Sequence, residues 1–246
     1  MKKKPYIILI VIVVLYFIIA ISALFYQKIN TTYLVFSDSI NLKLGKKISI
    51  LNNQKIPNYK FKIIQNGQVL DKQKIKATDT GMMYKNTLLE EDQIAYRGKI
   101  NPVNYITDSL GADDYTYISS ILKNNNINVN IQDVSYLYKY KIDINQDKID
   151  ETIYVVSNNY DTDIGELFSL VVIKEENIIL DLEKFDNEYA AFIPYLYFID
   201  YKKDGKVEII IKSVYSSMMG QSIKILSFQN NLEYNTIYEE VYRYET

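Results

Sequence analysis

The chain has 246 residues, of which 24% are charged and 48% hydrophobic, and its formal net charge is -2. Its length suffices for a membrane anchor plus one or two domains with hydrophobic cores, and its composition argues against disorder and against many membrane spans. The balanced charge argues against nucleic acid as a partner, because nucleic acid is bound by a basic face and the lysines are spread along the chain.

Cysteine and histidine are both absent. Without them the chain has no thiolate nucleophile, no thiolate or imidazole zinc site, no Ser-His-Asp triad and no histidine pH switch. No disulfide can stabilise the fold, which is compatible with a domain outside the cytoplasm but does not require one. We therefore assign no catalytic residue from the sequence.

An uncharged apolar run extends from Tyr6 to Phe25, directly after three lysines. About 20 helical residues span the roughly 30 Å of a bilayer's hydrocarbon core. We expect residues 1–28 to form a short cytoplasmic stub and an uncleaved, single-pass transmembrane helix in the cell membrane, with the rest of the chain extracytoplasmic. The small residues from Ala20 to Ala23 leave a cleaved signal peptide as the alternative.

Residues 29–122 are expected to form a β-rich exported region. Short apolar or alternating runs such as TYLVF, INLKLGKKISIL and YKFKIIQNGQVLDKQKI are separated by turn signals, which is typical of strands. The pair Asn66-Gly67 predicts a hairpin turn within the last of these runs, because both residues tolerate the positive φ of a type I′ turn.

One short helix is expected near the end of this region. Asp113 or Asp114 can cap the segment YTYISSILK, whose apolar side chains fall on one face. These side chains are Ile118, Ile121 and Leu122. Ser120 and Lys123 have the S-x-x-K spacing of penicillin-recognising enzymes, but the S-D-N and K-T-G elements of such a site are absent. We interpret this pair as ordinary helix surface.

The Asn-rich residues 123–130 predict an irregular linker, which leaves 131–246 as a second exported region. That region contains two segments that align without a gap, YLYKYKIDINQDKIDETIYVVS and IPYLYFIDYKKDGKVEIIIKS. Corresponding residues are 57 positions apart, so that Asp143 matches Asp200. A further strand, turn and strand follow in each copy. We expect a mainly β fold in which a hairpin unit occurs twice, as a sandwich or a partial propeller-like sheet.

The acidic loops of the two copies resemble the FG-GAP or VCBS-type repeats of integrin-alpha-like propellers, whose loops read roughly D-x-[DN]-x-D-G-x-x-[DE] before an apolar strand. The resemblance covers roughly Tyr136 to Tyr234 and implies a calcium ion held between two strands, in keeping with the preference of calcium for oxygen ligands. The implied ligands in the first loop are Asp143, Asn145, Asp147, the backbone carbonyl of Ile149, and Glu151.

The second loop is expected to be the weaker site. Its matching ligands are Asp200, Asp204 and Glu208. Lys202 occupies a ligand place there, and Lys148 replaces the family's glycine in the first loop. An EF-hand is argued against, because its bidentate glutamate would fall on Tyr154 or Ile211. Acidic turns without metal remain the alternative for both loops.

These features favour a non-enzymatic, membrane-anchored binding or accessory protein, whose partner is an unidentified extracytoplasmic protein or glycan. The first alternative is a hydrolase of cell-surface glycans that uses carboxylates alone, since aspartate and glutamate are the main acid and base groups left without histidine and cysteine. The second alternative is a structural subunit of a membrane assembly.

Overall fold

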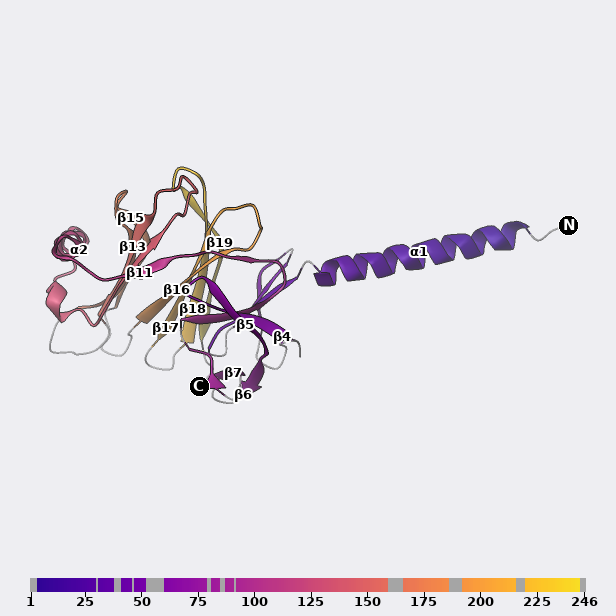
Figure 1. Ribbon diagram of the computed structural model, residues 1–246, viewed down its shortest axis with the longest axis horizontal. Coiled ribbons are helices and arrows are strands. Elements are labelled where there is room, and N and C mark those ends of the chain that lie inside the picture. The colour runs from indigo at the N-terminus through magenta and orange to yellow at the C-terminus, as the bar shows by residue number, and fades with distance from the viewer. Residues whose placement is uncertain are drawn as a thin grey trace.

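A computed structural model describes residues 4–29, 31–37, 41–45, 47–51, 60–78, 81–84, 87–90, 92–158, 166–185, 192–215 and 220–243. Antiparallel sheets make up most of the folded body, and a long helix extends away from it (Figure 1). The expectation of a mainly β protein is therefore confirmed.

The N-terminal sheet has the strand order β3-β2-β1-β9-β4-β5. Its strands are β1 (Thr32–Val35), β2 (Asn41–Leu44), β3 (Ser49–Leu51), β4 (Lys60–Gln65), β5 (Gln68–Lys74) and β9 (Gln93–Arg97). Asn66 and Gly67 join β4 to β5 with φ angles of 49° and 73°, which confirms the predicted hairpin turn. A small sheet beside it contains β6 (Lys76–Thr78), β7 (Gly81–Tyr84) and β8 (Thr87–Leu88).

Each copy of the repeat forms its own sheet, so the twofold occurrence of the unit is confirmed. The first-repeat sheet contains β11 (Ile106–Asp108), β12 (Tyr136–Ile142), β13 (Glu151–Asn158), β14 (Leu167–Ile173) and β15 (Ile178–Phe185), in that order. The second-repeat sheet contains β10 (Asn101–Pro102), β16 (Phe192–Asp200), β17 (Glu208–Tyr215), β18 (Gly220–Phe228) and β19 (Tyr234–Arg243). In both sheets the register shifts in the last strand pair.

The two repeat sheets stack head to tail. Ile153 of the first sheet and Ile209 of the second lie in one core between them. At the 57-residue spacing Ile153 corresponds to Ile210, which lies on the other face of its sheet and packs against Leu34 and Ile94 of the N-terminal sheet. Equivalent faces of the two repeats therefore point the same way, and the N-terminal sheet covers the outer face of the second-repeat sheet.

Helix α2 (Ala112–Asn124) covers the opposite end of this stack (Figure 1). Its buried residues Ile118, Ile121 and Leu122 pack on Tyr154 and Phe168 of the first-repeat sheet, which confirms the predicted apolar face. Gly111 is the N-cap, and Asp114 is the third helical residue rather than the cap. A short 3-10 helix, η2 (Ile131–Asp133), follows the irregular residues 125–130.

The segment before the predicted linker packs with the repeats as well as with the N-terminal sheet. Strand β10 pairs with β16, and β11 pairs with β12, so residues 101–108 add one short strand to each repeat sheet. The N-terminal sheet shares a hydrophobic core with the second-repeat sheet. The folded body is thus a continuous series of layers, in the order α2, first-repeat sheet, second-repeat sheet and N-terminal sheet.

Helix α1 (Lys4–Ile29) projects alone from the body (Figure 1). Its side chains are described from residue 10 to residue 24, and all of them are exposed. Within the described part of the chain, no helix is both long and apolar enough to cross a membrane.

Candidate functional site

The first acidic turn joins β12 to β13, and its polar side chains bind the turn's own backbone. Asp143 accepts a hydrogen bond through Oδ2 from the N–H of Lys148 at 3.0 Å. Asp147 accepts one through Oδ1 from Ile149 N–H at 2.8 Å, and Asn145 accepts one from Asp147 N–H at 2.9 Å. Three of the predicted ligands therefore already have oxygens engaged in shaping the turn.

Glu151 closes the same turn from the first position of β13. Its Oε2 accepts a hydrogen bond from Ile144 N–H at 2.7 Å, and the residue is 8% exposed. Burial raises the pKa of Glu151, and the charges of Asp147 and Asp143 raise it further, while the Ile144 hydrogen bond opposes the shift. A buried carboxylate costs free energy that a nearby cation would reduce.

The second turn, between β16 and β17, repeats three of these four hydrogen bonds at the 57-residue spacing, whereas Asp204 N–H donates to Asp200 Oδ1 at 3.2 Å because Lys202 replaces Asn145. Its three corresponding hydrogen bonds are Gly205 N–H to Asp200 Oδ2 at 3.3 Å, Lys206 N–H to Asp204 Oδ1 at 3.1 Å, and Tyr201 N–H to Glu208 Oε2 at 2.9 Å. The acidic side chains thus have equivalent structural tasks in both copies.

Lys148 adopts the backbone conformation that glycine has in the second turn. Its φ is +75°, and that of Gly205 is +87°. A side chain in this left-handed region costs about 1 kcal/mol relative to glycine. Gln146 and Lys203, also 57 residues apart, have φ values of +65° and +58°. The lysine replacement therefore leaves the tight turn intact, at a cost in strain.

Glu208 lies in a more closed environment than Glu151. It is 0% exposed, and burial raises its pKa to about 7. The Tyr201 N–H hydrogen bond and the charge of Lys202, whose Nζ is 3.8 Å from Glu208 Oε1, both oppose the shift. The ammonium that occupies a ligand place in the second copy thus faces the carboxylate that would have bound an ion.

The two turns meet at a hollow of about 460 Å³. Asp143 and Asp200 both line it, and Asn101 donates a hydrogen bond through Nδ2 to Asp200 Oδ2 at 2.9 Å. The side chain of Gln146 lies close to Gly205, because a Cβ added to that glycine would come within 2.8 Å of the Gln146 amide. The lining residues are Asn101 to Asn104, Asp143, Gln146, Lys148, Asp150, Asp200, Gly205 and Val207.

The predicted calcium ligands fit a metal only in part. Among the described residues, no three acidic side chains lie close enough together to hold a metal ion. Asp143 has one oxygen that the hydrogen bonds of the turn do not use, since its Oδ1 is buried and has no hydrogen-bond partner. The structure brings Asp143 and Asp200 to one hollow, whereas Asp147, Glu151, Asp204 and Glu208 do not line it.

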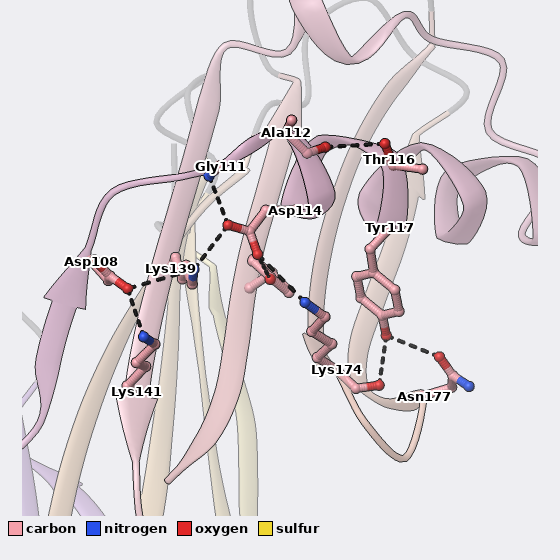
Figure 2. A network of polar contacts seen from close by, with 11 residues as sticks. Asp108, Gly111, Ala112, Asp114, Thr116, Tyr117, Lys139, Lys141, Lys174 and Asn177 are labelled. Carbon is pink, nitrogen blue, oxygen red and sulfur yellow. Dashed lines mark hydrogen bonds and ion pairs between the residues drawn. The ribbon is translucent and has the colours of Figure 1, made fainter.

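A second polar cluster, which sequence reasoning missed, surrounds Asp114 at the start of α2 (Figure 2). Asp114 Oδ2 lies 2.8 Å from Lys139 Nζ and accepts the N–H of Gly111 at 2.8 Å. Its Oδ1 accepts the hydroxyl of Tyr154 and lies 3.6 Å from Lys174 Nζ. Burial opposes ionisation, but the hydrogen bonds from Gly111, Lys139 and Tyr154 hold the pKa of Asp114 well below its usual range.

The position of this cluster follows from a difference between the two copies. Lys139 and Tyr154 are cross-strand partners, and their counterparts 57 residues later are Leu196 and Ile211, which are also partners. Leu196 and Ile211 pack in the core between the two repeat sheets. The first copy thus has polar groups where the second has apolar ones, and they bind the helix that caps the stack. The difference is visible in the sequence when residues 57 positions apart are compared along β12 and β13, where Lys139 and Tyr154 match Leu196 and Ile211.

The S-x-x-K pair lies on the surface of α2, as expected. Ser120 and Lys123 are both exposed, and Ser120 Oγ donates a hydrogen bond to the carbonyl of Tyr117 at 2.6 Å.

Comparison with protein-family models, with curated proteins and with solved structures finds no match for this chain. The resemblance of the acidic loops to FG-GAP or VCBS-type repeats stays a prediction from the sequence.

Proposed function

We propose that the protein is a membrane-anchored, non-enzymatic binding or accessory module outside the cytoplasm, in which α1 is the anchor and the stacked sheets form the exposed body. The observation that carries this proposal is the exposure of α1. Large apolar side chains from Ile10 to Leu24 are 49% to 73% exposed, on every side of the helix. A helix that is apolar all round is stable only where an apolar medium covers it.

The dimensions of the whole of α1 agree with this proposal, although its described side chains alone, residues 10 to 24, do not form a span long enough to cross a membrane. The helix has 26 residues, or about 39 Å at 1.5 Å per residue, against about 30 Å of bilayer hydrocarbon. The sequence adds apolar residues on both sides of the described side chains, from Tyr6 to Phe25. The body, in contrast, buries its apolar side chains in its own layers, which suits a domain standing in water.

The positions and hydrogen bonds of the acidic side chains favour a binding role over a carboxylate hydrolase. Asp143 and Asp200 line the hollow between the turns, but each accepts a hydrogen bond from a backbone N–H group of its own turn, so each carboxylate already shapes the turn. Glu208 has a pKa near neutrality but is fully buried away from the hollow. A retaining or inverting hydrolase needs an acid and a base that both face one substrate.

Calcium is proposed as a stabilising ion of the first turn. The support is the buried, unpartnered Oδ1 of Asp143 beside a buried Glu151 whose pKa is raised by its surroundings. A cation there would supply the missing partner and lower the cost of the buried charge. Binding would require the carboxylates of Asp147 and Glu151 to move closer to Asp143 than they are in this structure, with Asn145 and the Ile149 carbonyl completing the ligand set. The second turn already has an ammonium, that of Lys202, beside Glu208.

Protease treatment of intact cells or right-side-out vesicles tests the proposed placement. The residues after Ile29 should be digested, and α1 should stay with the membrane after alkaline washing. Protection of the body would show that the domain faces the cytoplasm. A mature chain beginning near Leu24 would show instead that the apolar segment is removed as a signal peptide.

A further inference from the structure

Helix α1 joins the body at a point flanked by two hollows. Thr32, the first residue of β1, follows the end of α1 at Ile29. Its Oγ1 accepts a hydrogen bond from Lys99 N–H at 3.0 Å. Gly98 lies directly against it, since a Cβ on that glycine would come within 2.4 Å of the Thr32 hydroxyl. Gly98 lines one hollow and Thr32 lines the other.

The first hollow is strongly basic. It measures about 420 Å³, and its lining residues are Lys60, Lys62, Lys72, Tyr96, Arg97 and Gly98. They come from β4, β5 and β9, which are neighbours in the N-terminal sheet. The Nζ of Lys62 lies 5.7 Å from the centre of the Tyr96 ring. Four of these six lining residues are basic, and none is acidic.

The second hollow adds basic groups on the other side of Thr32. It measures about 190 Å³, and its lining residues are Thr32, Leu44, Gly45, Lys99, Tyr201, Lys202 and Lys203. Lys202 Nζ lies 3.8 Å from Glu208 Oε1, and Lys99, Lys202 and Lys203 are all exposed. The lysines and the arginine of both hollows form what we term the basic collar: Lys60, Lys62, Lys72, Arg97, Lys99, Lys202 and Lys203.

The collar is a product of the fold. Its residues are scattered over positions 60 to 203, in a chain whose formal net charge is -2. The second turn contributes Lys202 and Lys203, Lys99 lies between β9 and β10, and the N-terminal sheet contributes the other four residues. A local excess of cations on a slightly acidic protein concentrates positive potential at one end of the body. That end is the one from which α1 emerges.

We propose that the basic collar binds the anionic headgroups of the phospholipids that surround α1. This inference rests on the proposed function, because it requires α1 to lie in a membrane, but it does not depend on which leaflet the body faces. A membrane that contains α1 places a headgroup layer at the foot of the helix, where the collar lies. Basic side chains near such a surface are attracted to anionic lipid within about a Debye length.

The phosphate of a headgroup also matches the chemistry of the first hollow. Lysine ammonium groups and an arginine guanidinium are the usual partners of phosphate oxygens. Engagement of both hollows would hold the body close to the bilayer. The opposite end of the stack, with α2, would then point away from the membrane.

Lysine acetylation, read by mass spectrometry on the full chain reconstituted in liposomes, tests the inference. In phosphatidylcholine mixed with phosphatidylglycerol, Lys60 and Lys62 should react about fivefold more slowly than in phosphatidylcholine alone. Lys123 on α2 is also exposed, and its rate should be the same in both. Equal rates for the collar lysines in the two lipids would overturn the inference.

Further measurements distinguish a wrong lipid assignment from a wrong membrane anchor. If inorganic phosphate protects the collar lysines equally well in phosphatidylcholine liposomes, the ligand is a soluble anion and the lipid assignment is overturned. Lys62→Glu should weaken the protection of Lys60, whereas Lys123→Glu, a matched reversal of an exposed lysine, should not. If the chain fails to float with liposomes of either composition, the proposed anchor itself is wrong, which is a different result from floating without protection.

Discussion

The ammonium of Lys139 lies 2.8 Å from the carboxylate of Asp114, and it occupies the place in the first repeat that Leu196 occupies in the second. The second repeat uses that place to pack on another sheet, while the first uses it to bind α2. A stack of repeats needs such a terminal cap, because an apolar outer face would remain exposed without one.

Asp114→Asn should destabilise the body by about 3 kcal/mol, because it leaves the buried Tyr154 hydroxyl without its charged acceptor and leaves Lys139 with only the more distant Asp108. Denaturant unfolding of the full chain in detergent, followed by tyrosine fluorescence, measures the change. Asp113→Asn is the matched control, since Asp113 is exposed on the same helix turn. Equal losses in the two variants would mean that the Asp114 cluster adds nothing beyond the helix N-terminus.

Gly67→Ala should be strongly destabilising, whereas Gly45→Ala should have a small effect. Gly67 has a φ of +73°, and an added Cβ would lie 2.3 Å from the carbonyl oxygen of Val103. At Gly45 the nearest atom would be 3.8 Å away, and no positive φ is required. We expect a loss of more than about 1 kcal/mol for Gly67→Ala from backbone strain alone. Similar melting temperatures for the two variants would contradict the close approach of the hairpin to Val103.

Lys148→Gly should stabilise the body by a few tenths of a kcal/mol to about 1 kcal/mol, by relieving the left-handed conformation that Gly205 adopts without strain. Lys206→Gly, at an exposed position two residues before β17, should instead be neutral or destabilising. Thermal unfolding of both variants under the same conditions provides the comparison. A loss of stability in Lys148→Gly would show that its side chain contributes more than its backbone costs.

Stability should fall as the pH rises from about 4.5 to about 7. Burial raises the pKa of Glu208 from 4.5 to about 7 in the folded chain, so in this window the unfolded chain has released a proton that the folded chain keeps. The loss amounts to about 3 kcal/mol at most. Below the window the carboxyl is protonated in both states, and above it no further loss follows.

Glu208→Gln should flatten this pH dependence. The variant should match the parent near pH 5 and exceed it near pH 8, because glutamine needs no proton to stay neutral. Glu151, whose pKa burial also raises, should leave a residual slope. Parallel curves of unfolding free energy against pH for parent and variant would show that Glu208 is ionised in the folded state.

Calcium should raise the melting temperature of the full chain in detergent, and a chelator should reverse the rise. Binding to the folded state alone stabilises it by about 2.7 kcal/mol at a hundredfold excess over Kd. Asp143→Ala should abolish the response, while Asp200→Ala should leave most of it, since Lys202 already neutralises charge in the second turn. The absence of calcium heat at millimolar concentration in calorimetry would leave both loops as acidic turns without metal.

Features that depend on residues close together in the chain can be read from the amino-acid sequence. The Asn66-Gly67 turn, the apolar face of α2 and the twofold repeat were predicted because turn conformation and periodicity are local properties. The acidic residues of the two loops were also identified, and their role as calcium ligands stays a prediction. Their oxygens accept hydrogen bonds from N–H groups a few residues away, and motif spacing alone does not distinguish that arrangement from a metal site.

Contacts between groups that are distant in the sequence depend on how the sheets and helices pack. Lysines from positions 60 to 203 gather at the foot of α1, although they are spread in the sequence. Asp114 meets Lys139 and Lys174 because α2 packs across the first-repeat sheet. Charge pairing acts over a few ångströms in space, whatever the separation along the chain. The order in which sheets and helix stack therefore determines which charges are paired inside the body and which face outward together.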